Sequence, residues 1–264
     1  MIAILSDIHS NIQALDAVLE DIPKEVSEIW VLGDTVGGMA SPCETLDRLM
    51  NLSIPVTSIL GNWEESFLAV KKGLILPQKS DKFANIMGFT YDALQAHHWA
   101  FLEELSSTLS IDTILGGAFL SHAKPWDCRD GIDTEEDAKE AAASRTEKWL
   151  FSGHYHHTRS FRVGNQRVVC VGSVGLSMDG IGGMACYTLL DGDKLSFKHV
   201  DYDVDAAIND LKNCEAAISA PGFVTAYVLG AASGQNYTQL FMDFAQAYDG
   251  TWEEAERAWV ESLE

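Results

Sequence analysis

Apolar residues along the first 60 positions follow two alternating patterns. Residues 2–6 form a nearly continuous apolar run, which is typical of a strand buried on both faces. From Asn11 to residue 19, apolar residues recur at the spacing of an amphipathic helix. The same two patterns return, with strands expected at 29–32 and 55–60 and a helix after Pro42. This alternation predicts a parallel sheet with helices on its faces.

The middle of the chain predicts helices first and then short strands. Residues 64–105 are expected to be mainly helical, and a hairpin is expected at about 109–120 with its turn at Gly116-Gly117. An acidic helix then precedes an apolar strand at 149–152. Short strands separated by turns at 161–200 indicate antiparallel strands and a second sheet.

The last part of the chain, from about Asp203, is predicted to be helical. It is very acidic, with Lys212 and Arg257 as its basic residues, and Pro221-Gly222 divides it in two. We therefore expect one domain over residues 1–202 and a helical, acidic C-terminal appendage over 203–264 that is not an independent domain. A helical cover over a sheet edge is its simplest interpretation, and a lid or a dimer element is the alternative.

Composition narrows the range of partners. The 264 residues are 47% hydrophobic, which allows a large core, and 18 basic against 39 acidic residues give a net charge of −21. Such a charge argues against long nucleic-acid partners, because phosphate neutralisation requires clustered Lys and Arg.

The five cysteines are scattered without a Cys-x-x-Cys pair, which favours reduced thiols. No apolar run reaches the roughly 18 residues of a membrane helix and no signal peptide is evident, so we expect no membrane partner and a cytoplasmic location.

Side chains that bind metals follow the predicted strands. In an open parallel sheet, sites form beyond the carboxyl ends of the strands, so these side chains have a geometric reason to converge. Mixed carboxylate, imidazole and amide ligands suit Mn, Fe or Zn better than Ca. The candidate ligands are Asp7, His9, Asp34, Asn62, His122, His154 and His156.

The order of these residues resembles the calcineurin-like metallophosphoesterases over roughly residues 1–200. The matching motifs are Asp7-Ile8-His9, Gly33-Asp34, Gly61-Asn62-Trp63-Glu64, His122 and Gly153-His154-Tyr155-His156. The resemblance implies an α/β fold, namely a four-layer αββα sandwich of two mixed sheets.

It also implies a dinuclear centre and a mechanism. Asp7, His9 and His156 would hold one metal, Asn62, His122 and His154 the other, and Asp34 would bridge them. Two transition metals, Mn, Fe or Zn with Mn the best expected activator, would share a hydroxide that attacks phosphorus.

One position departs from the family pattern. Most members have histidine where this chain has Trp63, and that histidine is thought to protonate the leaving oxygen. Without this help, leaving groups that are already stable as anions should react best. His157 and Glu64 are candidate substitutes, although supporting or surface roles are favoured for both. Trp63 itself would either stack on a base or pack at the wall of the site.

The Gly-Asn-Trp-Glu variant, with Asp201-Tyr202-Asp203-Val204, resembles a narrower group that includes a bacterial diadenosine tetraphosphate hydrolase. It implies a small phosphorylated substrate, such as a diadenosine polyphosphate. The alternatives are a general phosphodiesterase, a nuclease acting on short nucleic acid, or a non-catalytic scaffold. Lys124, Trp126 and Arg129 would contact substrate phosphate or form a solvated loop, and a homo-oligomer is possible.

Overall fold

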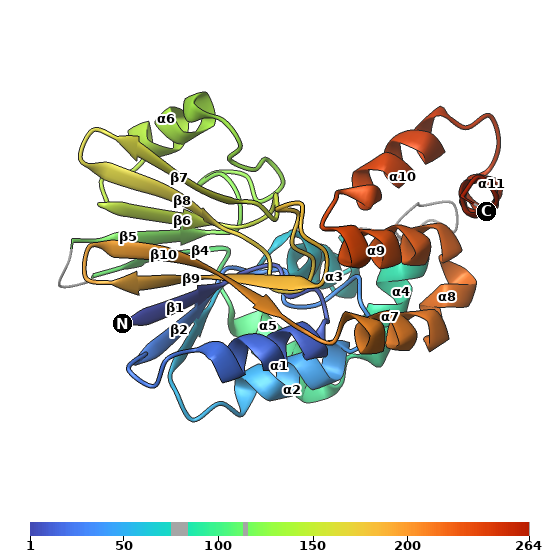
Figure 1. Cartoon of the computed structure of the whole chain (residues 1–264), viewed down its shortest axis with the longest axis horizontal. Helices are drawn as coiled ribbons and strands as arrows, with labels where there is room; N and C mark the ends of the chain where they lie inside the picture. Colours follow the sequence, from blue (N-terminus) through green and yellow to red (C-terminus); the bar gives the residue numbers. More distant parts are fainter. Residues whose placement is uncertain (75–83, 113–115, 264) are drawn as a thin grey trace.

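Two five-stranded sheets lie face to face, with helices on their outer faces. The computed structural model describes residues 1–74, 84–112 and 116–263. Figure 1 shows the two sheets on one side of the molecule, α1 and α2 over one outer face, and α6 over the other. The four-layer αββα sandwich of two mixed sheets is therefore confirmed.

The first sheet has the strand order β10-β9-β1-β2-β3. The strands β1, β2 and β3 run parallel, as the alternating pattern predicts, and β9 pairs with β1 in the antiparallel sense. Its strands are β1 (Ile2–Leu5), β2 (Glu28–Val31), β3 (Val56–Ser58), β9 (Met184–Asp191) and β10 (Lys194–Asp201). The covering helices are α1 (Ile12–Asp21) and α2 (Pro42–Met50).

The second sheet has the strand order β4-β5-β6-β8-β7. Its strands are β4 (Thr108–Ile111), β5 (Ala118–Ser121), β6 (Trp149–Ser152), β7 (Thr158–Val163) and β8 (Gln166–Val171). The predicted hairpin is confirmed as the antiparallel pair β4 and β5. The strands at 161–200 do not share one sheet, because β9 and β10 return to the first sheet. Their apolar pattern predicts strands, but it does not select a partner.

One apolar core lies between the sheets. In β1, Ile4 faces inward and packs with Trp30 and Phe151, whereas Ala3 and Leu5 face the helices outside. This period of two explains why β1 reads as a continuous apolar run, since both of its faces are buried.

The remaining elements of the described chain are helices. The helices between β3 and β6 are α3 (Asn62–Lys71), α4 (Ala84–Ala93), α5 (Ala96–Glu104) and α6 (Glu135–Ala143). The C-terminal helices are α7 (Val204–Asn213), α8 (Ala216–Ser219), α9 (Pro221–Ser233), α10 (Tyr237–Ala247) and α11 (Trp252–Glu261). Within the described ranges, none of these helices has the length and apolarity needed to cross a membrane.

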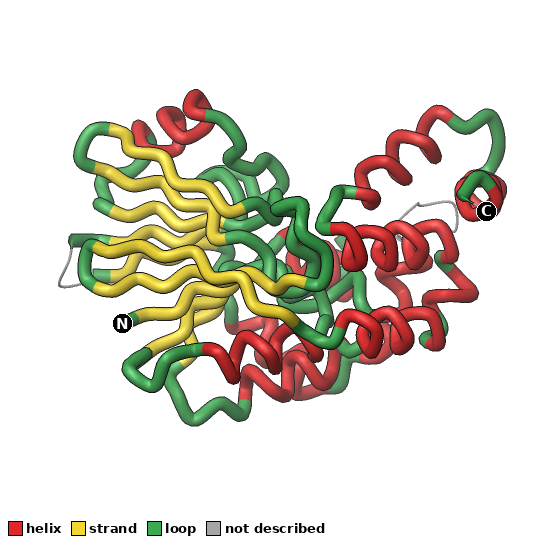
Figure 2. The backbone as a smooth tube through the Cα atoms, viewed as in Figure 1, coloured by secondary structure: helices red, strands yellow, loops and turns green. Residues whose placement is uncertain are grey.

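The C-terminal helices pack at the end of the sandwich and do not cover a sheet edge. Their apolar cluster is built around Phe223, Phe241 and Trp259, and it includes Met39 and Leu176 from the loops that follow the strands. Figure 2 shows these loops between the strands and the C-terminal helices. The preferred sequence interpretation, a cover over a sheet edge, is therefore wrong. Two distant loops complete the apolar cluster, and the local sequence does not specify them.

Candidate metal centre

The seven candidate ligands come together at one end of the sandwich. Asp7 and His9 follow β1, Asp34 follows β2, Asn62 begins α3, His122 follows β5, and His154 and His156 follow β6. Six of them form two groups of three whose ligand atoms lie within 4.8 Å of one another. The first group is Asp7, His9 and His156, and the second is Asp34, His122 and His154.

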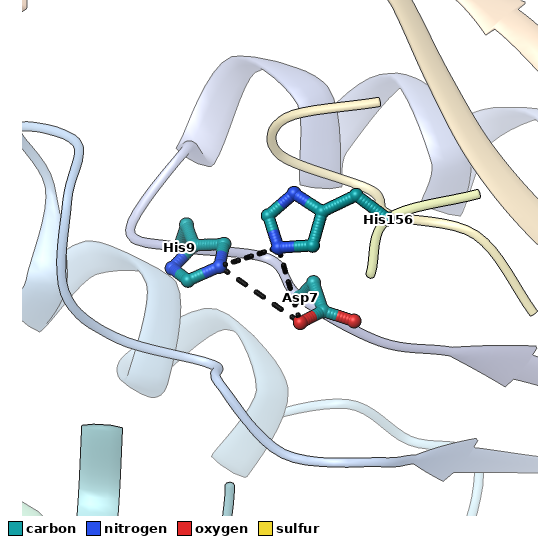
Figure 3. A group of neighbouring side chains, drawn as sticks. All are labelled: Asp7, His9 and His156. Atoms are coloured by element: carbon teal, nitrogen blue, oxygen red, sulfur yellow. Dashed lines mark hydrogen bonds and ion pairs between the residues drawn. The ribbon is translucent and has the colours of Figure 1, made fainter. Parts of the chain in front are cut away.

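The first group is compact and buried. The Nε2 atoms of His9 and His156 are 3.1 Å apart, and Asp7 Oδ1 lies 3.3 Å from His156 Nε2. Figure 3 shows all three side chains pointing toward one shared space. Asp7 Oδ2 accepts the backbone N–H of His154 at 3.0 Å, so the carboxylate is fixed with Oδ1 toward that space.

Asn62 lies beside the second group. Its Oδ1 lies 3.0 Å from His122 Nε2 and 3.0 Å from His154 Nδ1. Asp34 Oδ2 lies 3.3 Å from His122 Nε2 and 3.9 Å from His9 Nε2, and so it faces both groups. Asp34 Oδ1 accepts the backbone N–H of Trp63 at 2.9 Å, which fixes this orientation. This geometry suits a carboxylate that bridges two metals.

Backbone carbonyls orient all four imidazoles. Each ring has one nitrogen within hydrogen-bond distance of a carbonyl oxygen, and its other nitrogen faces the centre. The contacts are His9 Nδ1 with Gly37 at 3.1 Å, His122 Nδ1 with Leu32 at 2.8 Å, His156 Nδ1 with Leu176 at 2.7 Å, and His154 Nε2 with Arg129 at 3.0 Å. A ring that donates to a carbonyl leaves its other nitrogen free for a metal, as is usual for metal-ligating histidines.

The backbone at the centre is strained. Every non-glycine residue with positive φ in the described chain is a candidate ligand or adjoins one. They are Asp7, His9, Ser10, Asp34, His154 and His156, with φ of 53°, 52°, 59°, 48°, 73° and 61°. Left-handed conformations cost energy for residues with a Cβ and cluster at functional sites. Here they turn the side chains inward just beyond the strand ends.

Glycine precedes three of the ligand positions because the loops approach one another closely. A Cβ on Gly33 would overlap the backbone of Gly61, and a Cβ on Gly61 would overlap Asp34. A Cβ on Gly153 would overlap the side chains of Ser6 and Asp7. The Gly-Asp, Gly-Asn and Gly-His motifs therefore combine a ligand with the small residue that lets the loops meet.

The donor set fits divalent metal ions. Asp7 Oδ1 is buried and has no hydrogen-bond partner among the described residues. In its present orientation, the Asn62 carbonyl oxygen faces only acceptor atoms, which a rotation of the amide or a cation between them would relieve. Buried polar atoms are normally satisfied, so these atoms indicate a cation site. Carboxylate, imidazole and amide donors suit Mn, Fe or Zn.

Electrostatics at the centre also favour a cation. Burial and the neighbouring His156 lower the pKa of His9 to about 4, which keeps this ring neutral at pH 7. Burial alone would lower the pKa of His122, but Asp34 and Asp7 outweigh it and raise that pKa to about 10. A positive charge nearby therefore stabilises the two buried carboxylates. This charge is either a proton on His122 or a metal ion that displaces that proton.

Glu64 organises two ligand loops, which agrees with the supporting role that the sequence favours over proton donation. It is 1% exposed, and its Oε2 accepts the N–H groups of Asp34 at 2.9 Å and Gly61 at 2.8 Å. Its Oε1 accepts the N–H of Val36 at 3.1 Å. The signal was available in the sequence, because a glutamate three residues after Gly61 fits a capping box at a helix start.

The two other candidate catalytic residues lie in different surroundings. Trp63 lies edge-on to the His9 ring at 6.1 Å between centroids, and its indole packs on Gly37. It also lines a cavity above the centre. His157 is not among the residues that line this cavity, and its Nδ1 lies 3.7 Å from Asp179 Oδ1. A proton-donor role for His157 stays a prediction that this position does not favour.

The loop after His122 lines a second cavity of about 260 Å³. Lys124 Nζ lies 2.9 Å from Asp130 and 2.8 Å from Asp137, so carboxylates already neutralise its charge. Arg129 pairs with Glu65 at 3.5 Å, and Trp126 is 55% exposed. These contacts favour a structural role for Lys124 over contact with substrate phosphate.

A further group of possible ligands is explained by hydrogen bonding. His98 Nδ1 accepts the backbone N–H of Gln95 at 3.1 Å, so its proton is on Nε2, 3.1 Å from Asp47 Oδ1. A nitrogen that carries a proton cannot bind a metal. This group, which also includes His97, therefore anchors α5 to α2.

Comparison with known sequences places these features in a family context. The model of the calcineurin-like phosphoesterase superfamily domain matches residues 1–194. An uncharacterized protein of Methanocaldococcus jannaschii is 28% identical over 232 residues, which are 78% of this chain and 90% of that protein. A symmetrical bis(5'-nucleosyl)-tetraphosphatase of Psychromonas ingrahamii is 30% identical over 86 residues. That match covers 32% of this chain and 31% of the tetraphosphatase.

Solved structures share the fold. A metallophosphoesterase from Sphaerobacter thermophilus has a TM-score of 0.71 at 24% identity, covering 88% of this chain and 98% of that one. A hypothetical protein from Pyrococcus horikoshii has a TM-score of 0.75 at 20% identity, covering 89% of this chain and 100% of that one. Both cover more of the chain than the family model does, so the likeness includes part of the C-terminal helices.

Proposed function

Because this chain belongs to the calcineurin-like phosphoesterase superfamily and is therefore a metal-dependent hydrolase, we propose that it hydrolyses a phosphodiester or phosphoanhydride bond of a small nucleotide. A diadenosine polyphosphate is one such substrate. The part of the proposal that concerns the nucleotide draws support from similarity to symmetrical tetraphosphatases. The chain spans only 31% and 56% of the length of two of these relatives, so their activity is a proposal for this protein.

The observation that carries the proposal is the convergence of the six other candidate ligands around Asp34. One oxygen of its carboxylate faces both histidine groups, and the other is held by a backbone N–H. We propose that Asp7, His9 and His156 hold one ion, that Asn62, His122 and His154 hold the other, and that Asp34 contacts both. Two such ions, with Mn the best expected activator, would supply a nucleophile and neutralise phosphoryl charge.

The protein's own residues provide orientation more than proton transfer. Backbone carbonyls hold the rings, and Glu64 holds the Asp34 and Gly61 loops together. Trp63 replaces the imidazole that usually protonates the leaving oxygen, and it has no acidic proton to give. Bonds whose leaving group is already a stable anion, such as phosphoanhydrides and aryl esters, should therefore react fastest.

A general phosphodiesterase or a nuclease acting on short nucleic acid is the alternative. The net charge of −21 counts against long nucleic acid but leaves short diesters open. The cytoplasmic location and a homo-oligomer stay predictions.

A substrate screen tests the proposal. The purified chain is supplied with Mn²⁺ and assayed against diadenosine polyphosphates, nucleoside triphosphates, cyclic nucleotides and aryl phosphodiesters, with metal content measured in parallel. We expect about two transition-metal ions per chain and turnover that Asp34→Asn abolishes. Wild-type rates in Asp34→Asn, or a metal-free and inert protein, would overturn the proposal.

A further inference from the structure

A cavity of about 280 Å³ opens directly above the candidate metal centre. Its floor consists of ligands, including His9, Asp34 and Asn62, and Trp63 forms part of one wall. The opposite wall comes from the C-terminal helices. Phe223 and Tyr227 lie one turn apart on α9, and Thr238 and Met242 lie one turn apart on α10, so each pair shares a helix face. These helices follow residue 194, where the family match ends.

Within the part of the chain that the structure describes, no Lys or Arg lines the cavity, so no basic side chain there receives additional phosphates. The nearby Lys124 lines a different cavity and is engaged by Asp130 and Asp137. In a chain with a net charge of −21, a polyphosphate tail inside this cavity would be repelled by the overall negative charge and would gain no ion pair with a described Lys or Arg. An uncharged group in the same cavity would not be repelled by this negative charge.

The lining suits a flat ring. Away from the candidate metal ligands, the wall includes the aromatic and thioether side chains of Phe223, Met178 and Met242. The volume of about 280 Å³ is just below the roughly 300–1,000 Å³ of typical small-molecule pockets, which suits a single ring system. Asn236 and Gln239 stand at the exposed rim and offer amide groups.

Tyr227 adds a hydrogen-bond donor at the metal end. It is 3% exposed and lines the cavity. Burial, with a smaller contribution from Asp34, raises the pKa of this phenol, so the O–H stays protonated. A buried hydroxyl that lines a cavity gains most when a ligand atom accepts its proton.

From these features we propose that the C-terminal helices complete the active site by binding one uncharged aromatic or heterocyclic ester group of a phosphodiester substrate. Met242 and Phe223 contact the ring, and Tyr227 donates to an oxygen or nitrogen near the reacting phosphorus. This inference rests on the proposed function, because the metal centre positions the phosphate. It narrows that function toward diesters that carry a nucleoside or aryl group and few additional charges.

A series of diesters with one shared leaving group tests the pocket. Methyl, phenyl and thymidine esters of para-nitrophenyl phosphate release the same phenolate and differ only in the retained group. We expect kcat/KM to be roughly 10- to 100-fold higher for the thymidine and phenyl esters, which is the range that ring contacts contribute. Equal values for all three esters would overturn the pocket proposal and leave the proposed function intact.

Substitutions on α10 test whether the preference for ring-bearing esters arises in this cavity. Met242→Lys places a charge in the cavity and should reduce the thymidine-to-methyl ratio of kcat/KM by about tenfold. Gln239→Lys at the exposed rim is a second variant that does not disturb packing, and it should reduce the ratio in the same direction. Leu240→Lys is the matched control, because Leu240 lies on the same helix, is 51% exposed and does not line the cavity. An unchanged ratio in both cavity variants would contradict the proposal.

Binding without turnover separates the two proposals. If neither these esters nor the compounds of the substrate screen are hydrolysed, the proposed function fails, and saturation-transfer NMR with adenosine then tests the pocket alone. Adenosine signals should respond with wild type and Leu240→Lys and be lost with Met242→Lys. No response from the wild-type protein would overturn the inference.

Discussion

At the scale of single residues, the centre depends on atoms that the rest of the fold leaves unsatisfied. Asp7 Oδ1 is buried and has no hydrogen-bond partner among the described residues, and five of the seven candidate ligands hold positive φ. Such strain persists only where surrounding contacts impose it. At the centre, backbone bonds such as His154 N–H to Asp7 and Trp63 N–H to Asp34 supply those contacts.

Trp63→His tests the leaving-group argument. The imidazole would restore a proton donor in the cavity, and general acids contribute about 10²–10⁴-fold in typical cases. We therefore expect a large gain on alkyl phosphodiesters and a small gain on para-nitrophenyl esters, measured as kcat/KM at saturating Mn²⁺. Trp63→Phe is the control that alters size without adding a donor. Equal gains on both substrate types would contradict the argument.

At the scale of elements, the start of α3 connects three loops. Glu64 reaches back from the first turn to N–H groups of Asp34, Val36 and Gly61. It therefore acts as a positioning residue for Asp34 and, through the helix start, for Asn62. Gly222 and Trp252 are joined in a similar way by Glu256, which is 2% exposed and accepts N–H groups from both.

Glu64→Gln should weaken both the fold and the metal centre. A buried amide would direct its own N–H toward backbone N–H groups, and each lost bond to a charged acceptor costs about 1.5–3 kcal/mol. We expect the free energy of unfolding to fall by about 2–4 kcal/mol in urea, with Mn²⁺ affinity reduced roughly 10- to 100-fold. Glu65→Gln is the neighbouring control, since Glu65 forms a partly exposed pair with Arg129. Equal losses of stability and of Mn²⁺ affinity in both variants would show that Glu64 has no special role.

Glu256 makes stability depend on pH. Burial raises its pKa above the ordinary value of 4.5, although the N–H groups of Gly222 and Trp252 act in the opposite direction. Its favourable contribution is complete below pH 4.5 and is lost as pH rises through the higher folded-state pKa. We expect wild type to lose Tm relative to Glu256→Gln between pH 5 and pH 8, whereas exposed Glu261→Gln runs parallel to wild type. A constant difference across this range would show that Glu256 does not titrate.

At the scale of the whole molecule, three parts of the chain meet at the metal centre. The first sheet supplies Asp7 and Asp34, the second sheet supplies His122 and His154, and the C-terminal helices close the cavity above them. Metals bound there would connect both sheets, and ligands that bind only the folded state stabilise it.

Metal removal should therefore lower the stability of the whole chain. At about 100 times Kd, bound metal contributes roughly 2.7 kcal/mol. For a domain of this size, that corresponds to a fall in Tm of about 5–10 °C after treatment with a chelator, which calorimetry can measure. Asp34→Asn should show little response to Mn²⁺. Asp47→Asn, in the group that includes His97 and His98, should keep the full rise in Tm on addition of Mn²⁺. If this variant lost the rise in Tm, the stabilising metal would bind at the Asp47 group instead of the candidate metal centre.

The sequence by itself determined the local structure and the chemistry of the centre. Apolar runs and helical spacing predicted β1 to β3, α1, α2 and the β4–β5 hairpin, because these patterns report which faces are buried. The ligand motifs could be recognised because each unites a donor and a glycine within a few residues. Glu64 was equally recognisable, as the third residue of a helix start, but its contacts to Asp34 and Val36 span separate loops.

Only the tertiary structure decided which distant segments meet. It returned β9 and β10 to the first sheet, paired Lys124 with acidic residues, and turned His157 toward Asp179. It also brought Tyr227 and Met242 over the metal centre. A local pattern specifies whether a residue is buried but not its neighbour, since strand partners and helix docking depend on packing across the whole chain.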